Sequence, residues 1–285
     1  MNAVIDGLRR LLLISGLVWA AAHGITAHAQ PASLQFGVLP NVSPRVIIES
    51  YQPFRTYLER RLGHSTEIVT ASNFKAFYAN LVAGKYDLAV IAANLGRLAE
   101  VDAGLRAFAI YEPEIPGLLV VHRGKQIRDP GELRGKALAL ANPQSLLAMK
   151  GMEWFVAQGL RAGVDFTTLH VRNDDSLAQV LNSGEAPMAM MSLGEFRAVR
   201  EDLRKELEIL LEFIRVPGFL MLTGSHVDKE LAMAIRNAVL ELPRHPEGEE
   251  FFKRTGVRTI RAVDRAEVAS LDSVLADTRR LISQP

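Results

Sequence analysis

Small polar side chains gather near the middle of the chain, where an apolar stretch gives way to a helical pattern. Residues 137–141 (ALALA) are predicted to form a short buried strand, and Asn142, Pro143 and Gln144 form the turn that follows. Ser145 is a favourable N-cap, because its hydroxyl can accept a hydrogen bond from the first helical turn. A strand that runs into a helix start leaves backbone N–H groups pointing at the turn. This stretch therefore predicts a seat for an anion or for a polar group of a ligand.

Three further loops combine small polar side chains with a predicted helix start, at residues 41–43, 72–73 and 93–94. In open α/β sheets, ligands bind beyond the carboxyl ends of the strands, where such loops meet helix N-termini. Each loop alone is also explained by ordinary capping, since Ser and Asn are preferred caps. The prediction of a site depends on all four loops lying at the same edge of two sheets. The predicted ligand contacts are Asn41, Ser43, Ser72, Asn73, Asn94 and Tyr111 from a first lobe, and Asn142, Gln144, Ser145, Asp174 and Ser192 from a second.

Two of the predicted contacts also have a purely structural explanation. Asp174 and Asp175 are adjacent carboxylates that can bind a ligand amine or a metal. The alternative is that Asp175 caps the next helix while Asp174 is solvated. Tyr111 ends a predicted strand, where it can stack on a ligand or belong to the core or hinge.

Metal and cofactor chemistry find little support in the residue pattern. The histidines beyond the N-terminal segment are scattered without metal-ligand spacing, and Met188, Met190 and Met191 are expected to fill core gaps. No phosphate-binding Gly-rich loop and no nucleophile–base pair occurs. We therefore predict a protein without cofactor, without metal and without enzymatic activity. In the less favoured alternative, an enzyme on the same fold would use Asp174, Asp175 or Glu195 as acid–base groups.

The first 29 residues have the order of a secretory signal peptide. Arg9 and Arg10 form a basic region, residues 11–22 an apolar one, and residues 27–29 (AHA) a cleavage site after Ala29. The alternative is a buried N-terminal helix. Cleavage would remove Arg9, Arg10 and Asp6 together, which turns the formal charge of +1 into zero and argues against a nucleic-acid partner.

Cysteine content and hydropathy bear on where the protein is located and on whether it is attached to a membrane. The chain has 285 residues, 48% of them hydrophobic, and no cysteine, so disulfides, thiolate chemistry and a lipid anchor on cysteine are excluded. No later stretch is long and apolar enough to span a membrane. We expect a protein of the periplasm without stable membrane insertion.

Strands and helices alternate along most of the chain. The alternation indicates an α/β fold with doubly wound sheets, divided into lobe one (residues 30–117 and 216–285) and lobe two (residues 118–215). After a return crossing at residues 215–222 we expect only helices, the last of which begins at Asp264 with Glu267 completing a capping box. Pro53 is expected to kink the helix that begins at Pro44, or to mark a fresh helix start. Strands are predicted at residues 34–39, 66–70, 87–91, 107–111, 118–122, 137–141, 168–171, 187–192 and 209–214, and helices at residues 44–62, 73–83, 145–160, 176–183, 194–207 and 228–242.

Five segments, in order along the whole chain after residue 29, resemble the periplasmic phosphate-, phosphite- and phosphonate-binding proteins of ABC importers, the PhnD-like family. These segments are LQFGVLPNVSP (34–44), YQPFRTYLERRLG (51–63), VAGKYDLAVIAAN (82–94), IRDPGELRGKALALANPQS (127–145) and VLNSGEAPMAMMS (180–192). The resemblance implies a type II periplasmic binding protein, with two doubly wound mixed sheets and a hinge of two crossing strands. It also implies a small-molecule ligand and an ABC transporter permease as partners.

The sequence differs from the family pattern in its loops. Members of the family carry several Ser and Thr residues after the first strand of lobe two, whereas here only Ser145 offers a hydroxyl. Glu195 is a possible counterpart of an acidic residue that holds a ligand amine in the family. We therefore expect a small polar or anionic solute, phosphonate-like by family, to bind between the lobes. The alternative is a sensory protein that presents a ligand to a histidine kinase or a chemoreceptor.

Overall fold

Strands and helices alternate through the computed structural model, which describes residues 33–125 and 127–283. The predicted signal peptide, residues 1–29, lies outside the described residues. The strands are β1 (Leu34–Val38), β2 (Thr66–Val69), β3 (Leu88–Ile91), β4 (Ala107–Glu112), β5 (Ile115–His122), β6 (Ala137–Leu140), β7 (Thr167–His170), β8 (Met188–Ser192), β9 (Leu207–Val216), β10 (Leu220–Thr223) and β11 (Thr259–Ala262). The α-helices are α2 (Pro44–Leu62), α3 (Phe74–Val82), α4 (Ala93–Ala103), α5 (Leu146–Ala157), α6 (Asp174–Ser183), α7 (Leu193–Ala198), α8 (Glu201–Arg204), α9 (Lys229–Glu241), α10 (Pro246–Thr255), α11 (Arg265–Ser270) and α12 (Leu275–Ser283), with 3-10 turns η1 (Pro130–Leu133), η2 (Leu242–Arg244) and η3 (Leu271–Val274).

The strands form two mixed sheets, which confirms the predicted fold class. The first sheet has the order β11-β4-β10-β3-β1-β2, with β1 parallel to β2 and β3, and β10 antiparallel to both β3 and β4. The second sheet has the order β7-β6-β8-β5-β9, with β6 parallel to β7 and β8, and β5 antiparallel to β8 and β9. The long strands β5 and β9 are therefore neighbours, and the chain returns from β9 to β10 of the first sheet within residues 217–219.

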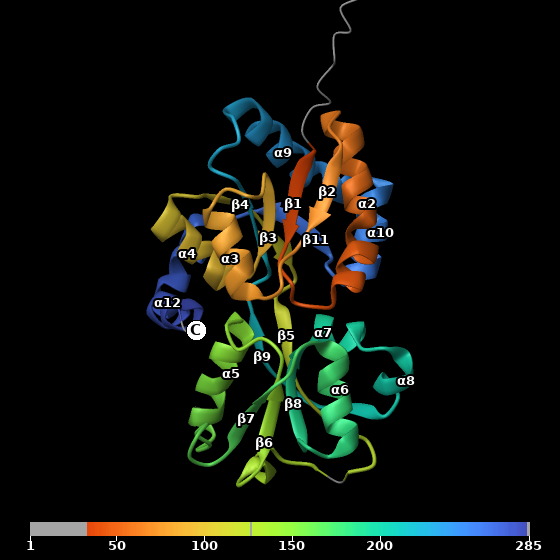
Figure 1. Ribbon diagram of the computed structural model, residues 1–285, viewed down its shortest axis with the longest axis vertical. Coiled ribbons are helices and arrows are strands. Elements are labelled where there is room, and N and C mark those ends of the chain that lie inside the picture. The colour runs from red at the N-terminus through yellow and green to blue at the C-terminus, as the bar shows by residue number, and fades with distance from the viewer. Residues whose placement is uncertain (1–32, 126, 284–285) are drawn as a thin grey trace, which may run out of the picture. The chain divides into compact units, whose positions relative to one another are not determined.

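Helices cover both faces of each sheet (Figure 1). In the first sheet, α3 and α4 lie on one face, while α2 and α10 lie on the other. In the second sheet, α5 lies on one face and α6 on the other. Because the covered strands face apolar neighbours on both sides, β3 is buried along its whole length, as an apolar run in a parallel strand predicts.

The aromatic centre of the first sheet lies between β1, α2 and α10. Phe251 of α10 is fully buried, and its ring meets those of Tyr51, Phe54 and Tyr111 at centroid distances of 5.1, 5.2 and 5.9 Å. Edge-on ring pairs at such distances stabilise beyond the apolar area that they bury. Three segments far apart in the sequence are therefore held together by one ring.

Helix α2 is continuous through Pro53, so the alternative of a fresh start there is wrong. Proline has no N–H, which leaves the carbonyl oxygen of Glu49, four residues earlier, without its helical donor. Nη1 of Arg254 donates a hydrogen bond to this oxygen at 2.8 Å. A side chain of α10 thus satisfies the carbonyl that the proline leaves free.

Three other local predictions are corrected. Asn173, and not Asp175, caps α6, because its side chain accepts the N–H of Ser176 at 3.0 Å. The capping box at Asp264 does not form, since the Glu267 carboxylate instead receives two hydrogen bonds from Arg261. The chain after residue 223 also contains a strand, β11, which pairs antiparallel with β4.

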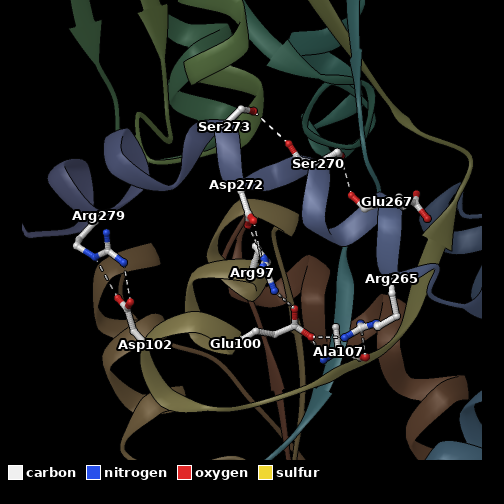
Figure 2. A network of polar contacts seen from close by, with 10 residues as sticks. All are labelled: Arg97, Glu100, Asp102, Ala107, Arg265, Glu267, Ser270, Asp272, Ser273 and Arg279. Atoms are coloured by element: carbon white, nitrogen blue, oxygen red, sulfur yellow. Dashed lines mark hydrogen bonds and ion pairs between the residues drawn. The ribbon is translucent and has the colours of Figure 1, made fainter.

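The C-terminal segment α11–η3–α12 is fastened to α4 by charged side chains (Figure 2). Arg97 of α4 pairs with Asp272 at 2.7 Å, and Arg279 of α12 pairs with Asp102 at 2.6 Å. Arg265 pairs with Glu100 at 2.9 Å. These contacts hold the C-terminal segment along the middle and the last turn of α4. Among the residues that the structure describes, no helix is both long and apolar enough to span a membrane.

Candidate functional site

A cavity of about 540 Å³ is lined by elements of both sheets, and we call it the inter-sheet cavity. Its polar lining comes largely from the carboxyl ends of strands, as the sequence predicts. Asn41 follows β1 and Asn142 follows β6, while Tyr111 is the penultimate residue of β4 and Ser192 the last of β8. Ser145 and Glu195 complete the set of predicted contacts that line this cavity. The structure thus brings six of the predicted contacts together from both sheets.

The loop after β6 has the predicted strand–turn–helix geometry. Ser145 caps α5, with its hydroxyl accepting the N–H of Ala148 at 3.0 Å. The next two residues, Leu146 and Leu147, also line the cavity. Their N–H groups have no acceptor within the described ranges, because the helical ladder of α5 begins after them. The start of α5 therefore presents free donors to the cavity.

Helix α7 contributes a second polar wall. Ser192 and Glu195 form a capping box, in which the Glu195 carboxylate accepts the N–H of Ser192 at 2.7 Å. The other carboxylate oxygen of Glu195 accepts a hydrogen bond from Nδ2 of Asn142 at 3.0 Å. Glu195 thus ties the loop after β6 to the loop after β8, and both loops belong to the second sheet.

Two buried carboxyl groups stand close enough to influence each other. Burial raises the pKa of Glu195, hydrogen bonds from Ser192 and Asn142 oppose the shift, and the negative charge of Asp174 adds to it. Burial likewise raises the pKa of Asp174, which is 2% exposed, so the expectation that it is solvated is wrong. Asp174 does not line the cavity. Its Oδ1 accepts a hydrogen bond from the N–H of Ser43 at 3.2 Å, which joins α6 of the second sheet to the start of α2.

The remaining predicted contacts lie away from the cavity lining. Asn94 is fully buried, and its Nδ2 donates to the carbonyl oxygen of Gln144 at 3.3 Å and to Thr278 at 3.2 Å. Asn73 caps α3 by accepting the N–H of Ala76, and its neighbour Ser72 does not reach the cavity either. For these residues the structure shows capping and packing contacts.

Several lining residues lie outside the predicted set. Tyr51 lines the cavity from the middle of α2, and its hydroxyl accepts a hydrogen bond from the Tyr111 hydroxyl at 3.4 Å. The Tyr51 hydroxyl hydrogen is then free to be donated into the cavity. Phe219 follows the return from β9, and Arg197 and Arg258 come from α7 and from the segment after α10. Of these residues only Tyr51 could have been noticed in the sequence. It is a tyrosine on an otherwise apolar helix face, and a buried tyrosine hydroxyl needs a hydrogen-bond partner.

The raised pKa of Glu195 gives a testable pH dependence. The folded protein holds this proton more tightly than the unfolded chain does, so wild-type stability falls as pH rises from about 4 through the raised pKa. The variant Glu195→Gln does not titrate, and its amide can keep an acceptor for Ser192. We expect its free energy of unfolding, relative to wild type, to be higher at about pH 7 than at about pH 4.

Urea denaturation of both proteins at the two pH values measures this difference. Glu185→Gln, which removes an exposed carboxylate after α6, is the matched control and is expected to show no such change. If the free energies of unfolding of wild type and Glu195→Gln differ by the same amount at both pH values, the prediction is contradicted.

Comparison with known proteins identifies the family. Residues 36–268 match the model of the family described as ABC transporter, phosphonate, periplasmic substrate-binding protein. This match takes in most of the chain and contains every residue named above as lining the cavity.

Solved structures share the fold at low sequence identity. A binding protein component of an ABC phosphonate transporter from Pseudomonas aeruginosa is 14% identical, with a TM-score of 0.75 over 88% of this chain and 89% of that chain. PhnD1 from Prochlorococcus marinus, in complex with methylphosphonate, is 12% identical, with a TM-score of 0.74 over 87% of this chain and 98% of that chain. XAC2383 from Xanthomonas citri, bound to chloride ion, is 19% identical, with a TM-score of 0.68 over 87% of this chain and 98% of that chain. By its family match, the chain belongs to the periplasmic substrate-binding proteins of phosphonate ABC transporters.

Proposed function

We propose that this protein binds a small phosphonate, or a related phosphorus oxyanion, in the inter-sheet cavity and delivers it to an ABC permease. The observation that carries the proposal is the cavity itself, whose polar lining comes from strand ends of both sheets. Its volume of about 540 Å³ lies within the range of small-molecule sites. The ligand class follows the family and the methylphosphonate complex of the Prochlorococcus marinus relative.

The start of α5 is the proposed seat of the acidic group. The free N–H groups of Leu146 and Leu147 point their positive ends beyond the helix, where the aligned peptide dipoles favour negative charge. Asn142 and Ser145 add side-chain polarity at the same place, and Asn41 and Tyr51 face the ligand from the first sheet. A phosphonate has three oxygen acceptors, so donors from several directions suit it.

Movement of the two lobes would control access. In this proposal residues 30–117 and 216–285 form one lobe, residues 118–215 form the other, and the chain crosses between them at β5 and at the end of β9. A ligand that contacts both lobes stabilises the conformation in which they are close together. The hydrogen bond from Ser43 to Asp174 contributes to the same conformation without a ligand. The protein would act in the periplasm after cleavage behind Ala29, and it would bind its ligand without converting it.

A binding screen of the exported protein tests this function. The panel holds phosphate, phosphite, methylphosphonate, ethylphosphonate, 2-aminoethylphosphonate, sulfate, carboxylates and amino acids. A ligand at about 100 times its Kd raises the free energy of unfolding by about 2.7 kcal/mol, which shifts the melting temperature visibly. We expect phosphorus oxyanions to shift it and calorimetry to give one site. A shift with amino acids or carboxylates alone would contradict the proposed ligand class.

A further inference from the structure

Two arginines without partners line the inter-sheet cavity, one from each sheet's set of helices and loops. Arg197 of α7 and Arg258, which follows α10, both line the cavity, and both are exposed. Within the described part of the chain, neither guanidinium forms an ion pair or a hydrogen bond. Arg197 nevertheless crosses to the first sheet, because its Nη1 lies so close to Gly256 that a Cβ there would collide with it. Gly256 stands two residues before Arg258, and both arginines belong to the lining of the same cavity.

The other arginines of the cavity lining are already neutralised. Arg215 pairs with Glu212 at 2.5 Å, and Arg254 pairs with Glu250 at 2.7 Å. The guanidinium of Arg197 lies beside Gly256 at the C-terminal end of α10, where carbonyl groups attract a cation. It nevertheless donates no hydrogen bond to these carbonyl groups. Its five N–H donors therefore remain available. Glu114 also lines the cavity but forms no ion pair with either unpaired arginine.

We propose that Arg197 and Arg258 form a second anion-binding subsite, which selects phosphonates that carry a second acidic group, such as a carboxylate. This subsite rests on the proposed function, since the first acidic group occupies the start of α5. The second group accepts charge-assisted hydrogen bonds from the two guanidiniums. The two arginines come from elements of different sheets, so a ligand held by both also bridges the lobes.

Calorimetry with matched ligands tests the subsite. Phosphonoacetate and 3-phosphonopropionate are compared with ethylphosphonate and propylphosphonate, which have the same carbon chains without the carboxylate. We expect the better-fitting carboxylate ligand to bind the wild-type protein about tenfold more tightly than its alkyl counterpart. The gain should shrink as salt is added, because both arginines are exposed to solvent.

Variants assign the gain to the two arginines. Arg197→Gln and Arg258→Gln are each expected to remove most of the carboxylate gain, while the affinity for the alkylphosphonates stays within about twofold. Lys253→Gln removes an exposed charge from α10 outside the cavity lining, and it is the control for net charge. Melting temperatures of all three variants check that the fold is intact.

The outcomes separate the subsite from the proposed function. If alkylphosphonates bind and the carboxylate ligands bind no more tightly, the subsite is overturned while the proposed function stands. The same holds if the gain survives in both arginine variants, or disappears equally in Lys253→Gln. If none of the phosphonates binds, the proposed function fails and the subsite fails with it.

Discussion

Replacing Ser145 with aspartate is expected to abolish phosphonate binding while leaving the protein at least as stable. Aspartate caps a helix about as well as serine, and a negative charge favours a helix N-terminus. The same carboxylate would occupy the seat next to the free N–H groups of Leu146 and Leu147 and would repel a second anion. We expect the Kd for methylphosphonate to rise by about 100-fold or more, measured by calorimetry. Thermal unfolding of the ligand-free variant should show an unchanged or higher melting temperature.

Asn73→Asp is the matched control for this experiment. Asn73 caps α3 through its side chain, as Ser145 caps α5, but it does not line the cavity. Aspartate at Asn73 should therefore leave binding unchanged. Unchanged binding in Ser145→Asp would show that Ser145 serves as a cap alone. A loss of binding in Asn73→Asp would instead place the ligand near α3.

The parts of the fold that follow local rules could be predicted from the sequence. Ser145 stands before an apolar helical pattern, and it caps α5 as expected. Gly63 follows the last periodic residue of α2 and adopts the left-handed conformation with φ of 68°. Both signals lie within a few residues of the feature that they specify. The strand-end position of Asn41, Asn142 and Ser192 follows from the same local reading together with the rule for ligand sites in α/β sheets.

The remainder of the site depends on contacts between distant segments, which spacing along the chain does not encode. Arg197 lines the cavity because α7 turns toward Gly256, although some 60 residues separate them in the printed sequence. Asp174 looked like a solvated helix-start residue, and it is buried because Ser43 donates to it from the other sheet. Glu267 had the spacing of a capping box, but Arg261 offered a charged partner, and a charge-assisted pair is stronger than a capping bond to a backbone N–H.

Truncating Phe251 to alanine is expected to have the largest effect on stability. The Phe251 ring is fully buried and touches Tyr51, Phe54 and Tyr111. Removal of a buried phenylalanine side chain costs about 3–5 kcal/mol, because transfer energy is lost and a cavity remains. Tyr51 and Tyr111 line the inter-sheet cavity, so a gap behind them should also weaken ligand binding. Urea denaturation followed by circular dichroism measures the first effect, and calorimetry measures the second.

Phe251→Leu separates volume from ring geometry. Leucine fills most of the space and is expected to cost less than about 1.5 kcal/mol, although it lacks the edge-on contacts of the ring. If Phe251→Leu recovers stability but not affinity, the ring itself holds Tyr51 and Tyr111 in the orientation that the ligand needs. If Phe251→Ala lowers the free energy of unfolding by less than about 1 kcal/mol, this ring does not fix α10. The aromatic centre then does not support Tyr51 and Tyr111 in the cavity lining. The sheets alone would then keep the inter-sheet cavity rigid, and Phe251→Ala would leave the Kd for the phosphonate unchanged.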